Sequence, residues 1–223
     1  MRGTFIIPTL NETQQISDLL SGLAQNYPEF ERIVVDGGST DATVTQAMPL
    51  CDKLLESTAG RAQQMNLGAQ VASGDYLFFL HADTRLGPDA SALKSLMLAQ
   101  PVWGFCRVQL SGSSWAFRVI EWFMNTRSRG TQVATGDQMI FVHRDAFDEL
   151  GGYDNIELME DVALSKRLKA VSPPSVIQSP VLTSSRRWEE GGIARTVLRM
   201  WALRFAYWCG ASPRALWQYY YGR

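Results

Sequence analysis

The sequence predicts an α/β fold in which a mostly parallel, Rossmann-like sheet is flanked by helices. Short apolar runs of strand length alternate with segments of helix length through the first hundred residues, and this alternation is typical of βαβ units. Residues 76–80, YLFFL, form a continuous apolar run that is typical of a strand buried on both faces. No repeat, low-complexity stretch or linker interrupts the 223 residues, so we expect a single domain, residues 1–223.

The first half alternates regularly. The expected strands are residues 4–7, 32–35, 53–56 and 76–80, and the expected helices are residues 13–24, 41–47, 61–72 and the segment from Pro88 to about residue 99. Open parallel sheets bind ligands just beyond the carboxyl ends of their strands. The polar residues that follow the second and fourth strands are therefore candidate site residues.

The second half is less regular. Expected strands are residues 103–110 and 138–143, and expected helices are residues 114–127 and 159–170, the second ended by SPPS at 172–175. Residues 193–209 read as a very aromatic helix, and Ser212 with Pro213 are typical of the N-cap and first residue of another. We expect these segments to form an aromatic helical appendage.

Charge and cysteine content narrow the function classes. The formal net charge of -1 favours no partner, nucleic acid included, but residues 186–223 carry seven arginines against two glutamates. This asymmetry indicates an anionic surface or ligand near the C-terminus. Cys51, Cys106 and Cys209 form no CxxC pair, so we expect neither a disulfide framework nor a zinc cluster. With no signal peptide and no 18-residue apolar run, we expect a cytoplasmic protein.

Two turns after predicted strands carry candidate ligand contacts. In DGGSTD, residues 36–41, Asp36 can accept hydrogen bonds from a base or ribose, although a plain βα turn explains the motif equally well. Neither GxGxxG nor GxxxxGK[ST] is present. In HADT, residues 81–84, Asp83 can hold a divalent cation together with phosphate oxygens, or merely bond within its turn. His81 has no third zinc ligand at a suitable spacing.

Two helix starts carry further candidates. Arg61, in AGRAQQMNLG, adds a fork-shaped donor to the free N–H groups of a helix N-terminus, which suits a diphosphate. A surface arginine is the alternative, although the helix dipole disfavours it there. Glu160 and Asp161 begin the helix of LMEDVALSKRL, where acids favour the dipole, but a pair in a cleft can also supply a general base. The residues alone leave these alternatives open.

Six blocks, in order, carry a family resemblance: PTLNE, VVDGGSTD, GRAQQMNLGA, FLHADT, TGDQ and EDVAL. Together they resemble the family 2 glycosyltransferases of the GT-A fold. The resemblance covers nearly the whole chain and is closest to the small subgroup linked to arsenosugar biosynthesis. It implies inverting transfer of a sugar from a nucleotide-sugar donor to a hydroxyl on a small-molecule or lipid-linked acceptor, with Mg²⁺ or Mn²⁺. It also implies a nucleotide-sugar-binding half (residues 1–100), an acceptor half (101–190) and the appendage (191–223).

The resemblance assigns roles on the donor side. Pro8, Glu12 and Asp36 resemble base and ribose contacts, and Arg61 resembles a nucleotide or diphosphate contact. Asp83 matches the last acid of the DxD motif, which holds the metal.

It assigns further roles to the catalytic and acceptor side. Asp161 matches the general base of the ED motif, with Glu160 beside it. The residues that are similar to acceptor-side positions are Gly136, Asp137, Gln138, Arg187 and Trp188.

The sequence departs from the family pattern at three positions. Gly37 replaces the second acid of DDGS, and His81 replaces the first acid of DxD. Ser184 replaces the glutamine of QxxRW, which argues against a processive synthase.

Two other functions fit parts of the sequence. A sugar-phosphate nucleotidylyltransferase shares the fold style but would need a glycine-rich, basic first loop, where this chain has PTLNETQ. A binding protein that holds nucleotide sugars without turning them over fits the same motifs. Metal-dependent hydrolysis of the donor that is lost on changing Asp161 would distinguish an enzyme from such a binding protein.

The aromatic C-terminal segment admits two interpretations. Residues 186–223 contain nine of the chain's 24 aromatic residues. A helix this apolar is normally buried against its own domain. Alternatively, part of it rests in a membrane interface, where arginines meet lipid phosphates and aromatic rings lie at headgroup level.

Overall fold

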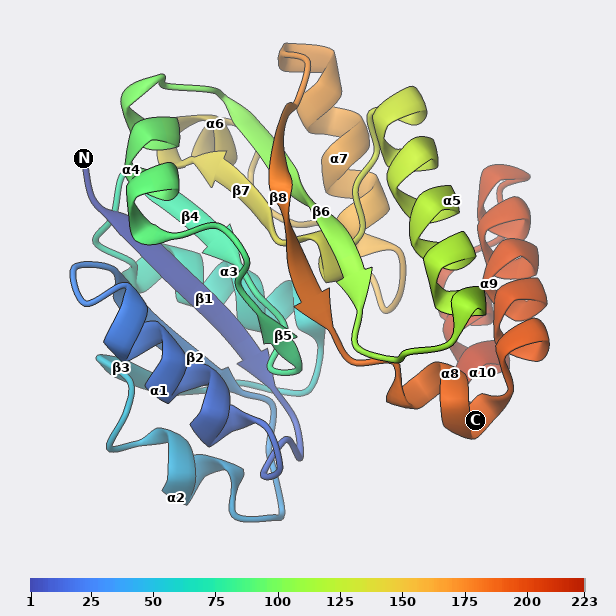
Figure 1. The fold of residues 1–223 in the computed structure, drawn as a ribbon, viewed down its shortest axis with the longest axis horizontal. Coiled ribbons are helices and arrows are strands. Elements are labelled where there is room, and N and C mark those ends of the chain that lie inside the picture. Colours follow the sequence, from blue (N-terminus) through green and yellow to red (C-terminus); the bar gives the residue numbers. More distant parts are fainter. Residues whose placement is uncertain (223) are drawn as a thin grey trace.

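The protein, seen in a computed structural model, is described over residues 1–222, without the side chains of Arg187 and Glu190. Within this range the strands form one eight-stranded sheet in the order β3-β2-β1-β4-β7-β6-β8-β5 (Figure 1). The strands are β1 (Gly3–Thr9), β2 (Glu31–Asp36), β3 (Lys53–Glu56), β4 (Tyr76–Phe79), β5 (Thr84–Arg85), β6 (Trp103–Leu110), β7 (Ile140–His143) and β8 (Ser175–Thr183).

The sheet is mostly parallel, as predicted. Strands β3, β2, β1 and β4 run parallel to one another. Strand β7 enters antiparallel between β4 and β6, while β8 runs parallel to β6. The carboxyl ends of β1, β2 and β4 therefore lie at one edge, which is where the polar turns of the first half emerge.

Helices cover both faces of the sheet. Helices α1 (Ile16–Asn26), α2 (Thr43–Ala47) and α4 (Ala90–Leu98) contribute to one core cluster, and α3 (Arg61–Val71), α6 (Arg144–Glu149) and α7 (Glu160–Val171) to the other. Strand β1 supplies both clusters, because successive side chains point to opposite faces: Phe5 and Ile7 to the first, Ile6 to the second. All seven residues of β1 are buried.

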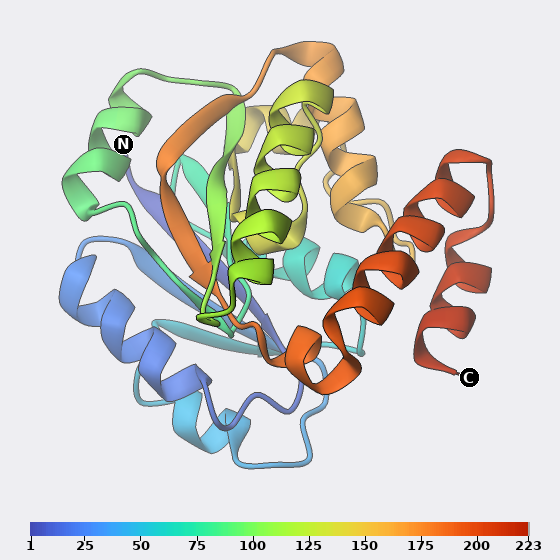
Figure 2. The same ribbon diagram turned by 45° about the vertical axis from the view of Figure 1, so that its right-hand side comes forward.

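The remaining helices lie beyond the β6–β8 part of the sheet. They are α5 (Trp115–Thr131), α8 (Arg186–Gly191), α9 (Ile193–Trp208) and α10 (Pro213–Tyr221). Figure 2 shows α9 and α10 side by side at one side of the body. Ser212 is the N-cap of α10, as predicted, and its side chain accepts a hydrogen bond from the N–H of Ala215. No helix within residues 1–222 is both long and apolar enough to cross a membrane.

Within the described residues, four helices and strands lie outside the expected ones: β5, β8, α6 and α8. Strand β8 begins at Ser175, the last residue of the predicted SPPS break, and contains Pro180. Its pairing with β6 shifts register between Cys106 and Val108. The expected strand 138–143 was wrong at its start. Residues Gly136–Gln138 form a 3-10 turn, and β7 begins at Ile140.

Candidate active site

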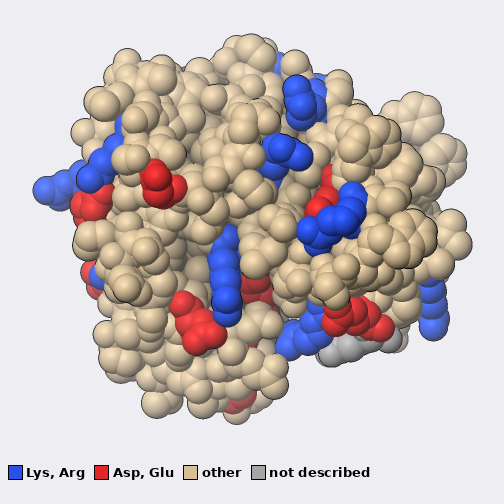
Figure 3. All heavy atoms as spheres, in the orientation of Figure 1, with Lys and Arg blue, Asp and Glu red and all other residues tan. Residues whose placement is uncertain are grey.

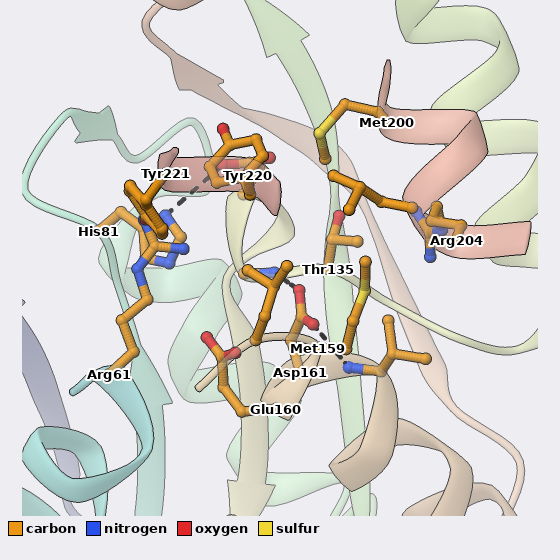
Figure 4. A pocket seen from close by; sticks show the side chains of 15 residues that line it. Arg61, His81, Thr135, Met159, Glu160, Asp161, Met200, Arg204, Tyr220 and Tyr221 are labelled. Atoms are coloured by element: carbon orange, nitrogen blue, oxygen red, sulfur yellow. Dashed lines mark hydrogen bonds and ion pairs between the residues drawn. The ribbon is translucent and has the colours of Figure 1, made fainter. Parts of the chain in front are cut away.

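A pocket lies between the N-terminus of α7 and the C-terminal helices (Figure 4). Its walls come from the start of α3, the turn after β4, the 3-10 turn, the start of α7, and helices α9 and α10. The lining residues are Arg61, His81, Thr135, Gly136, Asp137, Leu158, Met159, Glu160, Asp161, Val162, Met200, Leu203, Arg204, Tyr220 and Tyr221.

Asp161 is held in place by two backbone donors. Its Oδ2 accepts a hydrogen bond of 2.8 Å from the N–H of Gly136, and its Oδ1 accepts one of 2.7 Å from the N–H of Val162. Burial raises the pKa of the Asp161 carboxyl, and these two bonds act against that rise because they stabilise the charged form. The carboxylate is therefore fixed in the pocket wall in a form that can accept a proton.

Glu160 lies in a different environment, although it is the next residue. Its side chain is 5 % exposed. Burial and the neighbouring charge of Asp161 raise its pKa, and the guanidinium of Arg61 opposes the rise. Two adjacent carboxylates in one cleft resist simultaneous ionisation. Two backbone N–H groups stabilise the ionised form of Asp161. When the pair carries one proton, we therefore expect the proton to be on Glu160.

His81 and the 3-10 turn form another part of the wall. Nδ1 of His81 lies 3.5 Å from Oδ1 of Asp137. A Cβ placed on Gly136 would lie 2.5 Å from Nε2 of His81, so the glycine permits a contact that any side chain would block. The residue in the place of the first DxD acid therefore packs against the turn that positions Asp161.

The C-terminal helices complete the pocket. Helix α9 supplies Met200, Leu203 and Arg204, and α10 supplies Tyr220 and Tyr221. Arg199 ties the two helices together. Its Nη2 donates to the carbonyl oxygen of Tyr219 at 2.9 Å and to that of Tyr220, and its guanidinium lies 4.7 Å from the ring centroid of Tyr220. A basic group at the end of a helix satisfies carbonyls that lack partners within it.

The sequence does not lead us to expect that α9 and α10 line the pocket. One signal was available: on a helical wheel Arg204 falls opposite Arg195 and Arg199. That position separates it from the other two arginines and places it on the face that meets the pocket.

On the donor side, Asp36 is engaged by its own turn. Its Oδ2 accepts from the N–H groups of Gly38 and Ser39, and its Oδ1 accepts from the hydroxyls of Ser39 and Thr9. Gly38 adopts a φ of 91°, a conformation that glycine allows at little cost. These hydrogen bonds are the ones expected of a plain βα turn. A ribose contact by Asp36 therefore stays a prediction.

The other donor-side residues lie along the same sheet edge. Pro8 is buried in β1 and pairs with Val35. Glu12 follows in the next loop, where its N–H donates to the hydroxyl of Thr43. Burial, together with the charge of Asp83, raises the pKa of Glu12, which indicates that the two carboxylates face the same region.

Asp83 is the candidate metal ligand. Its Oδ1 is buried and has no hydrogen-bond donor within the described part of the chain. A buried carboxylate oxygen without a donor is costly, and a cation is one partner that would remove the cost. The described residues contain no group of three or more His, Cys, Asp or Glu side chains arranged for a metal. Asp83 therefore fits a cation only where phosphate oxygens and water supply the other ligands, as is usual for Mg²⁺.

Two predicted acceptor-side residues with described side chains, Gln138 and Trp188, do not line the pocket. Gln138 is fully buried. Its Oε1 accepts from the hydroxyl of Ser128, and its Nε2 donates to the carbonyl of Cys106. Trp188 packs beside the cluster of Leu110, Phe117 and Ile120. The side chain of Arg187 lies outside the described residues. Gly136 and Asp137 do line it.

The first half of the chain is similar to a known protein family. Residues 4–100 match the family model described as glycosyl transferase family 2. An uncharacterized glycosyltransferase of Mycobacterium tuberculosis is 36 % identical over 143 residues, covering 59 % of this chain and 54 % of that protein. A poly-beta-1,6-N-acetyl-D-glucosamine synthase of Staphylococcus aureus is 34 % identical over 94 residues, covering 39 % of this chain and 23 % of the synthase. The chain thus spans about half the length, or less, of these curated relatives.

Solved structures share the fold over most of this chain. S. aureus TarS 1–349 superposes with a TM-score of 0.64 at 18 % identity, covering 92 % of this chain and 66 % of that one. The mannosyltransferase PcManGT from Pyrobaculum calidifontis, solved in complex with GDP-Man and Mn²⁺, gives a TM-score of 0.66 at 22 % identity, covering 92 % and 61 %. Residues 4–100 accordingly resemble the family 2 glycosyltransferases, and the fold of the chain matches that of GT-A glycosyltransferase structures.

Proposed function

We propose that the protein transfers a glycosyl group from a nucleotide sugar to a hydroxyl acceptor with inversion at the anomeric carbon. The observation that carries this proposal is the position of Asp161, whose carboxylate is fixed by two backbone N–H groups at the wall of the pocket. Asp161 takes the proton of the acceptor hydroxyl while that oxygen attacks the anomeric carbon. The bond from this carbon to the diphosphate oxygen breaks in the same step, and the nucleoside diphosphate leaves.

The donor lies across the sheet edge in this proposal. Pro8, Glu12 and Asp36 flank the base and ribose, and Arg61, at the first turn of α3, contacts the diphosphate. Related folds support a nucleotide-sugar donor: TarS has been solved with UDP and with UDP-GlcNAc, and PcManGT with GDP-Man. Asp83 would hold Mg²⁺ or Mn²⁺, which would offset the negative charge on the departing diphosphate.

The acceptor enters between the 3-10 turn and the C-terminal helices. Gly136 and Asp137 form one side of this entrance, and Arg204 and Tyr220 form the other. In this proposal Gln138 fixes the conformation of the 3-10 turn through its buried hydrogen bonds. It does not contact the acceptor directly, whereas the family resemblance implies that it does. An arsenic-containing sugar as the product stays a prediction of the subgroup resemblance.

The direct test is a screen of nucleotide sugars with Mn²⁺, read first by thermal shift and then by release of nucleoside diphosphate. We expect one donor to raise the midpoint of unfolding and to be hydrolysed slowly without an acceptor. A donor that stabilises the protein but is never turned over, with any acceptor supplied, would instead indicate a binding protein.

A further inference from the structure

Helix α9 exposes its apolar face. Leu198, Trp201, Phe205 and Trp208 follow one another at intervals of three or four residues, which places them on one side of the helix. Their side chains are between 58 % and 76 % exposed. Leu203 is the only residue of α9 that is buried within the described chain. The interpretation that so apolar a helix is buried therefore holds only for its inner face.

Helix α5 continues the same surface. Its outward side chains Trp115, Val119, Trp122 and Phe123 are between 42 % and 77 % exposed. The rings of Phe123 and Trp201 lie with their centroids 6.2 Å apart, which joins the two helices. We call these outward side chains the α5–α9 surface: Trp115, Val119, Trp122, Phe123, Leu198, Trp201, Phe205 and Trp208. Contiguous exposed apolar areas of this kind on soluble proteins usually mark an interaction site.

The charged side chains on α5, α9 and α10 are mostly basic, although Glu189 is exposed on the adjoining helix α8. Arg118, Arg129 and Arg195 are exposed on the same two helices. Among the described residues of α5, α9 and α10, Glu121 is the only acid. Its Oε1 lies 2.8 Å from Nη2 of Arg118. In Figure 3 the side of the molecule formed by α5 and α9 is mostly uncharged, with both basic and acidic side chains among the tan atoms.

We propose that the α5–α9 surface docks the protein onto a bilayer that contains anionic lipid. Tryptophan and phenylalanine are favoured at the interface between headgroups and acyl chains, and arginines beside them meet lipid phosphates. A second copy of the chain fits less well, because a symmetric dimer through this patch would place arginines against arginines. The proposal concerns the outer surface only, so it holds whichever sugar the pocket transfers.

The test is cosedimentation with vesicles of phosphatidylcholine alone or mixed with phosphatidylglycerol, at low and high salt. We expect binding to the anionic vesicles at low salt, weakened by salt because the Debye length shortens. The variant Trp201→Ser/Phe205→Ser should lose most of the binding. Arg129→Gln and Arg195→Gln should each weaken it about fivefold, since a basic residue at an anionic surface contributes about 1 kcal/mol.

Matched controls separate docking from general stickiness. Met48→Ser/Leu98→Ser removes two exposed apolar side chains far from the α5–α9 surface, and Arg2→Gln removes a distant exposed charge. These variants should bind as the unaltered protein does, and all variants should keep its unfolding midpoint, because every substituted side chain is exposed. Absence of binding at low salt, or equal loss in the controls, would overturn the proposal. So would a dimer in sedimentation equilibrium that Trp201→Ser/Phe205→Ser abolishes, because a second copy would then cover the surface.

Discussion

Asp161 and Glu160, at the start of α7, are expected to have different roles in catalysis, and single substitutions distinguish these roles. Asp161→Asn keeps the size and one acceptor oxygen but removes the base, so transfer should slow by roughly 100- to 10,000-fold while donor affinity is retained. Glu160→Gln should cost much less, because Gln resembles the protonated acid that we assign to Glu160. Steady-state rates and donor titrations measure both effects. A larger loss in Glu160→Gln would move the base to Glu160.

The same pair predicts a pH dependence of stability. Burial raises the pKa of Glu160 above 4.5, its ordinary value, so the folded protein keeps this proton to a higher pH than the unfolded chain does. The free energy of unfolding must then fall as pH rises above that ordinary value. Glu160→Gln removes this term, so the variant should be more stable than the parent at neutral pH and equal to it in acid. Unfolding midpoints between about pH 4 and 8 measure the difference, and a constant difference would contradict it.

At Asp83, the expectation concerns a cation rather than a proton. Its buried Oδ1 has no donor in the described structure, and we expect a divalent cation held with the donor diphosphate to supply the missing partner. Asp83→Asn should therefore abolish the enhancement of nucleoside diphosphate affinity by Mn²⁺ without unfolding the protein. Calorimetric titration with and without Mn²⁺ checks this. Equal affinity in both conditions for the unaltered protein would refute the metal role.

At the scale of elements, the contact between the 3-10 turn and the turn after β4 can be tested through Gly136. Gly136→Ala forces the ring of His81 to move, and overpacking of this kind costs about 1 kcal/mol or more. Adding His81→Ala should return part of that stability, which denaturant unfolding would show. Gly130→Ala in α5 is the matched control, because nothing lies within 4 Å of its Cβ and alanine favours a helix. Strict additivity of Gly136→Ala and His81→Ala would argue against the contact.

The elements also show what the sequence could predict. Alternating apolar runs locate β1 to β4 and α1 to α4, because each run must bury one face against its neighbours in sequence. Strand β8 is hidden by Pro180 and by its half-buried side chains, which carry no clear alternation. Periodicity places Arg204 on a face of α9, but it does not identify the neighbour of that face. Met159 precedes Glu160 with a φ of 70°, and no sequence pattern predicts so unusual a backbone for methionine.

On the scale of the whole molecule, we expect one cooperative unit rather than separable donor and acceptor halves. Strand β4 lies between β1 of the first half and β7 of the second, and all its residues are buried. Phe78 packs against Phe141 across this boundary, with ring centroids 5.9 Å apart. Calorimetry should show a single transition with an enthalpy of about 150 kcal/mol near 60 °C, and residues 1–100 alone should not fold. Two resolved transitions would contradict the single-domain assignment.

Helix α9 has one face in the wall of the pocket and another on the outer surface, so a single rigid body takes part in both. Any shift of this helix that is favoured at one face changes the free energy at the other. By thermodynamic linkage the effect is reciprocal: a surface contact that tightens the hold on a pocket ligand by some factor is itself tightened by that ligand by the same factor. Binding of a ligand in the pocket and attachment of the protein to a surface would then be thermodynamically coupled through the position of α9.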